Sequence, residues 1–239
     1  MTMGLRDPMQ LAIVTVALRR AVEDMGYCIT ISENFHAFAE MRARCRGGKV
    51  APFFDPAVNA GLDKRAFWVG AENSTGVPIC LQAFRIDTAE PNLADWAPGW
   101  IMGLYLRRGE LLVPRAAAPP ASSVTERVVG RMVYHGELWI DPKLRGNGLL
   151  DILPRMGMLL AMIKWQPDAM WAIIGQTMAT RGQITRLGYN HLERGFLQWE
   201  FLPEGGEDIE WLAIAEREEL EYLVQETRLK VSASQAGGK

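Results

Sequence analysis

The chain has 239 residues, of which 49% are hydrophobic, and a formal net charge of −2 with a pI near 6.0. We expect a single domain over residues 1–231, with an insertion at about 90–125 and a flexible tail at 232–239. The scattered basic residues and the small negative charge argue against a nucleic-acid partner. The start of the chain resembles neither a signal peptide nor a membrane span, and the three cysteines lack metal-type spacing. We therefore expect a cytoplasmic protein with no membrane contact and no disulfide.

Turn and cap signals divide the first half of the chain into short elements. Asp7 and Pro8 are typical of a helix start, and apolar residues then recur at intervals of three or four. Ser32 is a candidate cap for a second helix that ends near Arg46. The predicted strands cover residues 27–31, 65–71 and 77–85, and the insertion contains a helix-compatible stretch at 93–114 and a loop at 116–123.

The second half of the chain alternates between strands and helices. Strands are predicted at 131–140, 168–175, 195–202 and 209–215, and helices at 147–165, 178–187 and 217–229. Pro154 lies about two turns into the first of these helices, where it removes a backbone hydrogen bond. We therefore expect a kink there or a short first segment.

The segment from residue 136 to 150 says most about function. An apolar strand ends at Asp141-Pro142, a turn carries Gly146 and Gly148, and a helix begins directly afterwards. The first N–H groups of a helix have no intrahelical partner and carry partial positive charge, so they bind phosphate oxygens readily. Glycine lets a phosphate approach the backbone closely. This order of elements predicts an anion site.

Two common nucleotide motifs do not match this turn. A P-loop needs glycine, four residues and then Gly-Lys-Ser/Thr, which does not occur in this segment. The dinucleotide motif needs a third glycine at position 151, where the chain has an aspartate that would repel a pyrophosphate. The anion site is therefore of another kind.

The spacing that does match is a basic residue, two residues, glycine, one residue and glycine, from Lys143 to Gly148. It follows a strand that ends in an Ile-x-Pro sequence. This pattern resembles the acetyl-CoA-binding signature of the GNAT superfamily of N-acetyltransferases.

The sequence downstream agrees with this resemblance. The predicted strand at 168–175, the helix at 178–187 and the Gly188-Tyr189 step resemble the family's core in order and spacing. The resemblance covers roughly residues 130–202, and the N-terminal half only by general arrangement. It implies an α+β fold with a central mixed, mostly antiparallel sheet of six to seven strands flanked by helices.

The resemblance also implies how a cofactor would bind. Acetyl-CoA or another acyl-CoA would serve as substrate, without a metal. The strand backbone would pair with the pantetheine arm and polarise the thioester carbonyl through Leu138, Trp139 and Ile140. The turn would hold the pyrophosphate through Lys143 and the amides of Arg145, Gly146, Asn147, Gly148 and Leu149. The alternative is an unrelated fold in which the glycines serve only tight packing.

The resemblance places the family's general base on the strand a few residues before its end, which offers Tyr134, His135 and Glu137. Alternation puts residues 134, 136, 138 and 140 on one face, so a base at the usual position would coincide with Tyr134 or Gly136. A bulge would reverse this and favour His135 or Glu137. We rank Glu137 first and His135 second, and each can instead be an ordinary sheet residue.

Two positions near the downstream helix depart from the family's pattern. Many members carry a tyrosine four residues before the Gly-Phe/Tyr step, and this chain has Ile184 there. The family's asparagine seven residues earlier corresponds to Thr177, which can hydrogen-bond the pantetheine arm or simply cap a helix. The isoleucine leaves protonation of the leaving thiolate without an assigned residue.

Two functions follow as hypotheses. The first is an enzyme that transfers an acetyl or short acyl group from coenzyme A to the amine of a small molecule or peptide by direct attack. The second is a catalytically weak acyl-CoA-binding or interaction protein on the same scaffold, which Ile184 motivates. Trp96 and Trp100 in the insertion are candidates for an acceptor pocket or a homodimer contact. The histidines at 36, 135 and 191 make no metal-binding pattern.

Overall fold

The computed structural model describes residues 7–110, 114–116, 123–144, 146–201 and 207–236. The strands of the described residues are β1 (Cys28–Ser32), β2 (Ala66–Glu72), β3 (Pro78–Ala89), β4 (Pro114–Ala116), β5 (Gly130–Ile140), β6 (Ala169–Ile174), β7 (His191–Trp199) and β8 (Ile209–Glu216). The helices are α1 (Pro8–Asp24), α2 (Phe35–Arg46), α3 (Leu93–Arg107), α4 (Leu149–Trp165), α5 (Gln176–Thr180), α6 (Ile184–Leu187) and α7 (Arg217–Ala236). Short 3₁₀ turns cover Pro52–Phe54, Leu62–Lys64, Val124–Glu126 and Pro142–Leu144.

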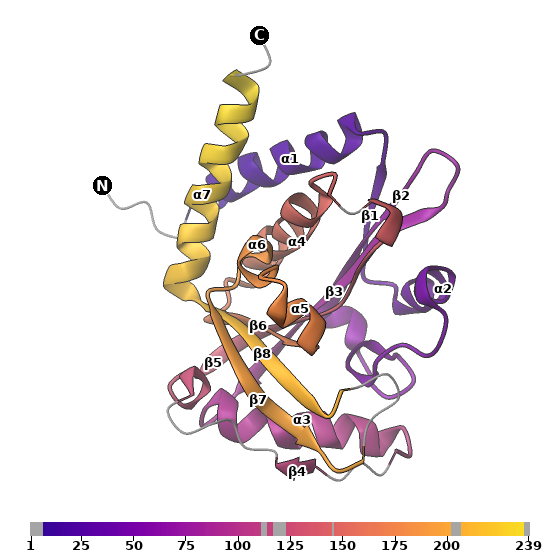
Figure 1. Ribbon diagram of the computed structural model, residues 1–239, viewed down its shortest axis with the longest axis vertical. Helices are drawn as coiled ribbons and strands as arrows, with labels where there is room; N and C mark the ends of the chain where they lie inside the picture. The colour runs from indigo at the N-terminus through magenta and orange to yellow at the C-terminus, as the bar shows by residue number, and fades with distance from the viewer. Residues whose placement is uncertain (1–6, 111–113, 117–122, 145, 202–206, 237–239) are drawn as a thin grey trace.

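All eight strands of the described residues belong to one sheet, in the order β1-β2-β3-β5-β6-β8-β7-β4 (Figure 1). Neighbouring strands are antiparallel except β5 and β6, which are parallel. The predicted class, a mixed and mostly antiparallel sheet flanked by helices, is confirmed. The short edge strand β4, inside the predicted insertion, brings the sheet to one strand more than six to seven.

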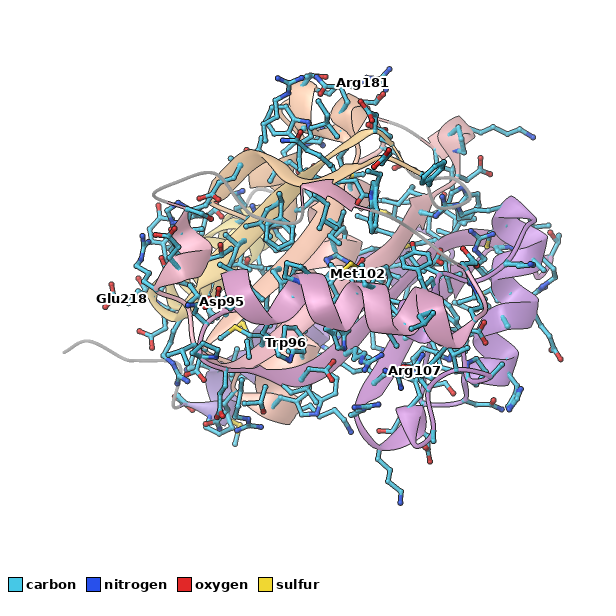
Figure 2. The ribbon with its side chains drawn as sticks, turned by 90° about the horizontal axis from the view of Figure 1, so that it is seen from below. Asp95, Trp96, Met102, Arg107, Arg181 and Glu218 are labelled. Atoms are coloured by element: carbon cyan, nitrogen blue, oxygen red, sulfur yellow. The ribbon has the colours of Figure 1, made fainter. Side chains whose placement is uncertain are left out.

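Each face of the sheet is covered by its own helices. Cys80 and Phe84 of β3 pack with α1, α4, α6 and α7 in one core, on what we call the α4 face. Leu81 and Ala83 of the same strand pack with α2 and α3 in a second core, on the α3 face. Figure 2 shows α3 lying across its face of the sheet. The alternation along β3 separates the two cores, and burial of apolar surface in both stabilises the sandwich of layers.

Local caps explain the helix starts. The Asp7 carboxylate accepts hydrogen bonds from the amides of Met9 and Gln10, as the sequence predicts for α1. The predicted cap of α2 is wrong, because Asn34 rather than Ser32 accepts from the first amides of that helix. The Ser32 hydroxyl instead accepts from the amide of Asn34, so α2 begins at Phe35.

Two helices of the second half differ from the sequence prediction. The predicted helix at 178–187 is two short helices, α5 and α6, because Gly182 between them has a φ of 64° that interrupts the helical backbone. Conversely, α4 runs from Leu149 to Trp165 as one helix rather than with a short first segment. Its residues around Pro154 are buried in the core, which holds the helix together despite the proline.

The last two predicted boundaries also shift. β7 begins at His191 rather than 195, because its pairing with β8 already starts with His191 opposite Ile214. α7 continues to Ala236, past residue 232 where the sequence predicts a loose tail. Residues 117–122 of the predicted loop, residues 203–206 before β8 and residues 237–239 lie outside the described residues. Within the described part, none of the helices combines the length and apolarity needed to cross a lipid bilayer.

Candidate functional site

The parallel strands β5 and β6 separate soon after they meet. Residues 132–134 of β5 pair with residues 169–171 of β6, although β5 continues to Ile140 and β6 to Ile174. From His135 onward, the described residues provide no ladder partner for the β6 side of β5. Its backbone N–H and C=O groups on that edge are therefore available to another molecule.

A β-bulge lies in β5 at the point where the strands separate. Ala83 pairs with Gly136 and Leu81 with Trp139, so Glu137 and Leu138 both oppose Gln82. Glu137 has a φ of 55°, which is uncommon for a residue other than glycine. The extra residue places Glu137 on the α3 face with Tyr134 and Gly136, and turns Leu138 to the α4 face.

This bulge corrects the simple alternation predicted for the strand. Residues 138 and 140 pack on the α4 face, opposite Tyr134. His135 also lies on the α4 face, where it stacks on Phe84. The predicted base candidates are therefore divided between the two faces, with Tyr134 and Glu137 on one and His135 on the other.

A cavity of about 510 Å³ occupies the opening between the strands. Residues 134–138 of β5 and 172–174 of β6 line it, together with Leu187 and Tyr189 from the α4 face and Tyr105 from the α3 face. The cavity therefore reaches through the sheet from one face to the other. Of the predicted site residues it brings together Tyr134, His135, Glu137 and Leu138, and its wall does not include Trp139, Ile140, Thr177 or the described residues of the turn.

Glu137 is held firmly at the α3-face end of the cavity. One carboxylate oxygen accepts from Arg42 at 3.2 Å and from Arg46 at 3.3 Å, and the other accepts from the amide of Ala51 at 2.8 Å. Its side chain is only 4% exposed. Both oxygens are thus engaged, and the carboxylate fixes α2 and the following segment against the bulge.

Glu210 is the carboxylate at this end whose acidity is most changed. It lies on β8, half-buried, and lines the same cavity as Glu137. Burial raises the pKa of Glu210 to about 7, the Trp199 indole beside it acts in the opposite direction, and the charge of Glu207 raises the pKa further. A carboxyl group with this pKa exchanges a proton near neutral pH.

His135 and Tyr189 form a buried pair at the α4-face end. The imidazole Nδ1 lies 2.9 Å from the Tyr189 hydroxyl oxygen, and both residues are buried. Burial lowers the pKa of His135 to about 3 and raises that of Tyr189. The imidazole is therefore neutral near neutral pH and is a weak base.

Tyr134 belongs to an aromatic cluster on the α3 face. Its ring lies 4.8 Å from that of Phe53 and 4.9 Å from that of Trp171, and burial raises its pKa well above the usual value. Trp96 and Trp100 stack on each other at 5.0 Å, and Trp100 packs edge-on against Tyr134 at 5.6 Å. The two tryptophans line the aromatic core rather than the cavity, which corrects their assignment to an acceptor pocket.

The turn after β5 has the backbone that its glycines predict. Gly146 and Gly148 have φ values of 89° and 87°, and a Cβ at either position would meet no atom within 4 Å. The turn is thus open to a ligand. The amide of Leu149, however, donates to the Asn147 side chain at 3.2 Å, and the amide of Asn147 to the carbonyl of Leu144 at 3.4 Å.

The charged groups around the turn favour an anion more than the sequence suggests. Lys143 is exposed and makes no ion pair with another described residue. The Asp151 carboxylate is paired through both oxygens with Arg186, at 2.8 and 2.6 Å, and this hydrogen bonding lowers its pKa. The pair offsets the repulsion expected of Asp151. Arg145 lies outside the described residues.

The two positions that depart from the family's pattern have different surroundings. Ile184 is buried, 3% exposed, at the start of α6. Thr177 is exposed in the first turn of α5 and does not cap it, because Gly175 holds the cap position. The amide of Gln176 donates to the Glu207 carboxylate at 2.6 Å instead.

One group of described residues has the arrangement of metal ligands. Ligand atoms of His191, Glu216 and Glu219 lie within 4.8 Å of one another where β7, β8 and α7 meet. Arg127 contacts Glu216, and the second oxygen of Glu219 accepts from the amide of Glu216 at 2.8 Å. None of the three lines the cavity. The spacing of the histidines could not indicate this group, since two of its members are carboxylates.

The sequence missed the residues that α2, α3, β8 and the Gly188-Tyr189 step bring to the cavity. Arg42, Tyr105 and Glu210 come from three distant segments, and nothing in their local sequence distinguishes them. The sequence indicates Tyr189 only as the second residue of the Gly188-Tyr189 pair that resembles the family's Gly-Phe/Tyr sequence. Its pairing with His135, 54 positions away in the chain, needed the fold.

Together these features define an α+β protein whose sheet is split between β5 and β6 by a cavity lined from both faces, with an anion-compatible turn at the end of β5. No protein-family model matches the chain, and no curated protein matches it in sequence.

Solved structures with a similar fold include acetyltransferases. NAA60 of Arabidopsis thaliana in complex with acetyl-CoA has 13% identity and a TM-score of 0.47, with 80% of this chain and 98% of that chain covered. A coenzyme A-dependent acyl-homoserine lactone synthase, BjaI, has 12% identity and a TM-score of 0.45, with 84% and 90% covered. A spermidine N-acetyltransferase chimera from Vibrio cholerae and hSSAT has 10% identity and a TM-score of 0.42, with 82% and 98% covered. At these identities and scores the likeness does not assign an activity to this chain.

Proposed function

We propose that this protein is a GNAT-type acyltransferase that moves an acetyl or other short acyl group from coenzyme A to an amine. The observation that carries the proposal is the cavity through the sheet, with the free edge of β5 on one wall and a carboxyl group of pKa about 7 on another. Direct transfer requires the donor carbonyl and the acceptor amine to meet, and a passage between the two faces allows each to enter from its own side.

The donor would bind along β5 and the turn. The unpaired edge from residue 138 to 140 offers backbone groups to the amides of a pantetheine arm, and an N–H there would polarise the thioester carbonyl. The open turn at Gly146 and Gly148, with Lys143 beside it, suits a pyrophosphate. The chain itself supplies few side chains to this end, which fits chemistry driven mainly by positioning.

The acceptor would bind at the α3-face end, where Glu210 would serve as the general base. The amine nitrogen forms a bond to the carbonyl carbon, its proton passes to Glu210, and the carbon–sulfur bond breaks to release coenzyme A as the thiolate, which takes a proton from solvent. Glu137 remains in the wall as the group that fixes the arginines of α2, since both its oxygens are engaged. His135 is neutral and weakly basic, which argues against it as the base.

A second function, acyl-CoA binding without efficient turnover, has a specific observation in its favour. Ile184 is buried and provides no proton for the leaving thiolate. Among the described residues on the α4-face wall of the cavity, the only polar pair is His135 with Tyr189. A scaffold that holds the donor without completing the reaction is consistent with that wall.

Thiol release with acetyl-CoA and a panel of amines distinguishes the two functions. The panel contains polyamines, amino acids and peptides with free N-termini. We expect thiol release that depends on one class of amine. Tight binding of acetyl-CoA by calorimetry with no release for any amine would favour the binding protein, and absence of binding would refute both.

The remaining expectations belong to the same proposal. All three cysteines, Cys28, Cys45 and Cys80, are unpaired, as in a reducing cytoplasm. A homodimer, an absence of metal and a single domain over residues 1–231 stay predictions. Size-exclusion chromatography with light scattering would test the first.

A further inference from the structure

The imidazole of His135 is held in place by two neighbouring rings. Its ring stacks on that of Phe84, with centroids 4.4 Å apart and planes inclined by 12°. Its Nδ1 lies 2.9 Å from the Tyr189 hydroxyl oxygen, and the residue is only 2% exposed. The ring therefore has a defined orientation without any ligand.

The other ring nitrogen of His135 is buried without a partner. Nε2 makes no hydrogen bond with any described residue, which is rare for a buried polar atom in a folded protein. A few other buried side-chain atoms of the described residues also lack a hydrogen-bond partner. Of the residues that carry such an atom, only His135 and Trp199 line the cavity. An unsatisfied nitrogen on a residue that lines a cavity indicates a ligand atom that completes its hydrogen bonding.

The contact with Tyr189 decides whether this nitrogen is a donor or an acceptor. The Tyr189 hydroxyl has no second partner among the described residues, so its proton is satisfied only if it donates to Nδ1 of His135. A neutral imidazole that accepts at Nδ1 carries its proton on Nε2. The unpartnered Nε2 is therefore an N–H donor.

The surroundings indicate which chemical group would accept this hydrogen bond. Leu138, Met178 and Leu187 line the cavity on the same side, which is unfavourable for an anion. A protonated amine is only a donor, and the lone pair of a neutral amine is needed for the attack on the thioester, so neither form matches an N–H group. A neutral carbonyl oxygen satisfies the donor in an apolar wall.

We infer that Nε2–H of His135, oriented by Tyr189, donates a hydrogen bond to a carbonyl oxygen of the bound acyl-CoA. This inference rests on the proposed function. The carbonyl is either that of the thioester or that of a pantetheine amide, and both share the chemistry that the site requires. Tyr189 is a positioning residue, since it acts through His135.

Three variants test the inference by calorimetry with acetyl-CoA and with coenzyme A. His135→Leu removes the donor, and we expect the Kd for acetyl-CoA to rise about tenfold. His135→Gln keeps an N–H group near the position of Nε2, so its Kd should stay within about threefold of wild type. Tyr189→Phe leaves the imidazole but frees its tautomer, and an intermediate loss is expected. Thermal unfolding of each variant confirms that it is folded.

The two ligands separate the two carbonyls. A loss in His135→Leu for acetyl-CoA alone assigns the thioester carbonyl, and an equal loss for coenzyme A assigns a pantetheine amide. Equal affinity of His135→Leu and wild type for both ligands would overturn the inference while leaving the proposed function intact. Failure of wild type to bind either ligand would refute both.

Nitrogen NMR of the labelled imidazole gives a readout that a structural role would not change. We expect the Nε2–H tautomer in the free protein, and a downfield shift of that proton when acetyl-CoA is added. A tautomer protonated on Nδ1, or a proton that does not respond to saturating acetyl-CoA, would contradict the inference and would instead indicate an enclosed water as the partner.

Discussion

The two ends of the cavity are built from different kinds of groups. The α4-face end combines apolar side chains, one neutral imidazole and free backbone of β5, whereas the α3-face end combines arginines with the carboxyl groups of Glu137 and Glu210. Backbone and apolar groups suit a ligand that must be aligned, and titratable groups suit one that must lose a proton. Under the proposed function, this difference suits a donor at the α4 face and an acceptor at the α3 face.

The sharpest way to break this assignment is to remove the carboxylate at the α3-face end. For Glu210→Gln we expect kcat to fall about 100-fold with an unchanged Kd for acetyl-CoA, because a general base typically contributes 10²–10⁴-fold. Steady-state kinetics and calorimetry measure the two quantities. Glu216→Gln, on the same strand but outside the cavity wall, is the matched control and should keep wild-type kcat. A fall in acetyl-CoA affinity in Glu210→Gln would indicate that the donor binds at the α3-face end, which would contradict the proposal.

The pH profile of wild type sharpens the same point. Burial raises the pKa of Glu210 to about 7, so the deprotonated, active form is lost as pH falls through that value. We expect kcat/KM to fall about tenfold for each pH unit below about 7 and to level above it. Since the charge of Glu207 also raises this pKa, Glu207→Gln should move the midpoint to lower pH. A flat profile between pH 5 and 9 would exclude Glu210 as the base.

A third prediction addresses the donor end. Gly146→Ala places a side chain at a φ of 89°, which costs about 1–2 kcal/mol of backbone strain although space is free. We expect acetyl-CoA affinity to fall about tenfold, by calorimetry, with little change in kcat at saturation. Gly76→Ala, in the β2–β3 turn at a φ of 76° and equally open, is the control. Both variants should lose similar stability, and only the first should lose affinity.

The smallest effect is expected at the ion pair beside the turn. Arg186→Ala leaves the charge of Asp151 uncompensated near the phosphate site, and we expect about a threefold loss of coenzyme A affinity. The pair is largely exposed, so the free energy of unfolding should change by less than about 1 kcal/mol. Adding Asp151→Asn should restore the affinity. If the double variant binds as weakly as the single one, Arg186 acts directly rather than by neutralising Asp151.

The turn after β5 could be predicted from the sequence because its features are local. The two glycines, the end of the strand before them and the start of the helix after them lie within about 15 residues. Positive φ values favour glycine, so the sequence itself indicates such a turn. The class of the sheet followed from the same order of elements. Even here, the capping of Leu149 by Asn147 could not be read from spacing.

The acceptor end could not be predicted because it is assembled from distant segments. Glu210 has an ordinary pKa in an unfolded chain, and its burial in the folded protein, with Glu207 nearby, raises that pKa. On its chemistry alone, Glu137 ranks first as the general base. Its carboxylate is bound by arginines of α2, about 90 positions earlier in the chain, and the local sequence does not reveal this pairing.

The bulge at Gly136 and Glu137 determines which face of the sheet each later residue of β5 points to. If residues 136–140 paired in regular alternation without the bulge, Leu138 and Ile140 would turn to the α3 face, and Trp139 would take their place against the core of α4. Because Glu137 is the extra residue opposite Gln82, its deletion would remove the bulge and leave Leu138 opposite Gln82 on the α4 face. The bulge therefore adds a carboxylate, and the arginines that it holds, to the α3 face without changing the face that Leu138 presents.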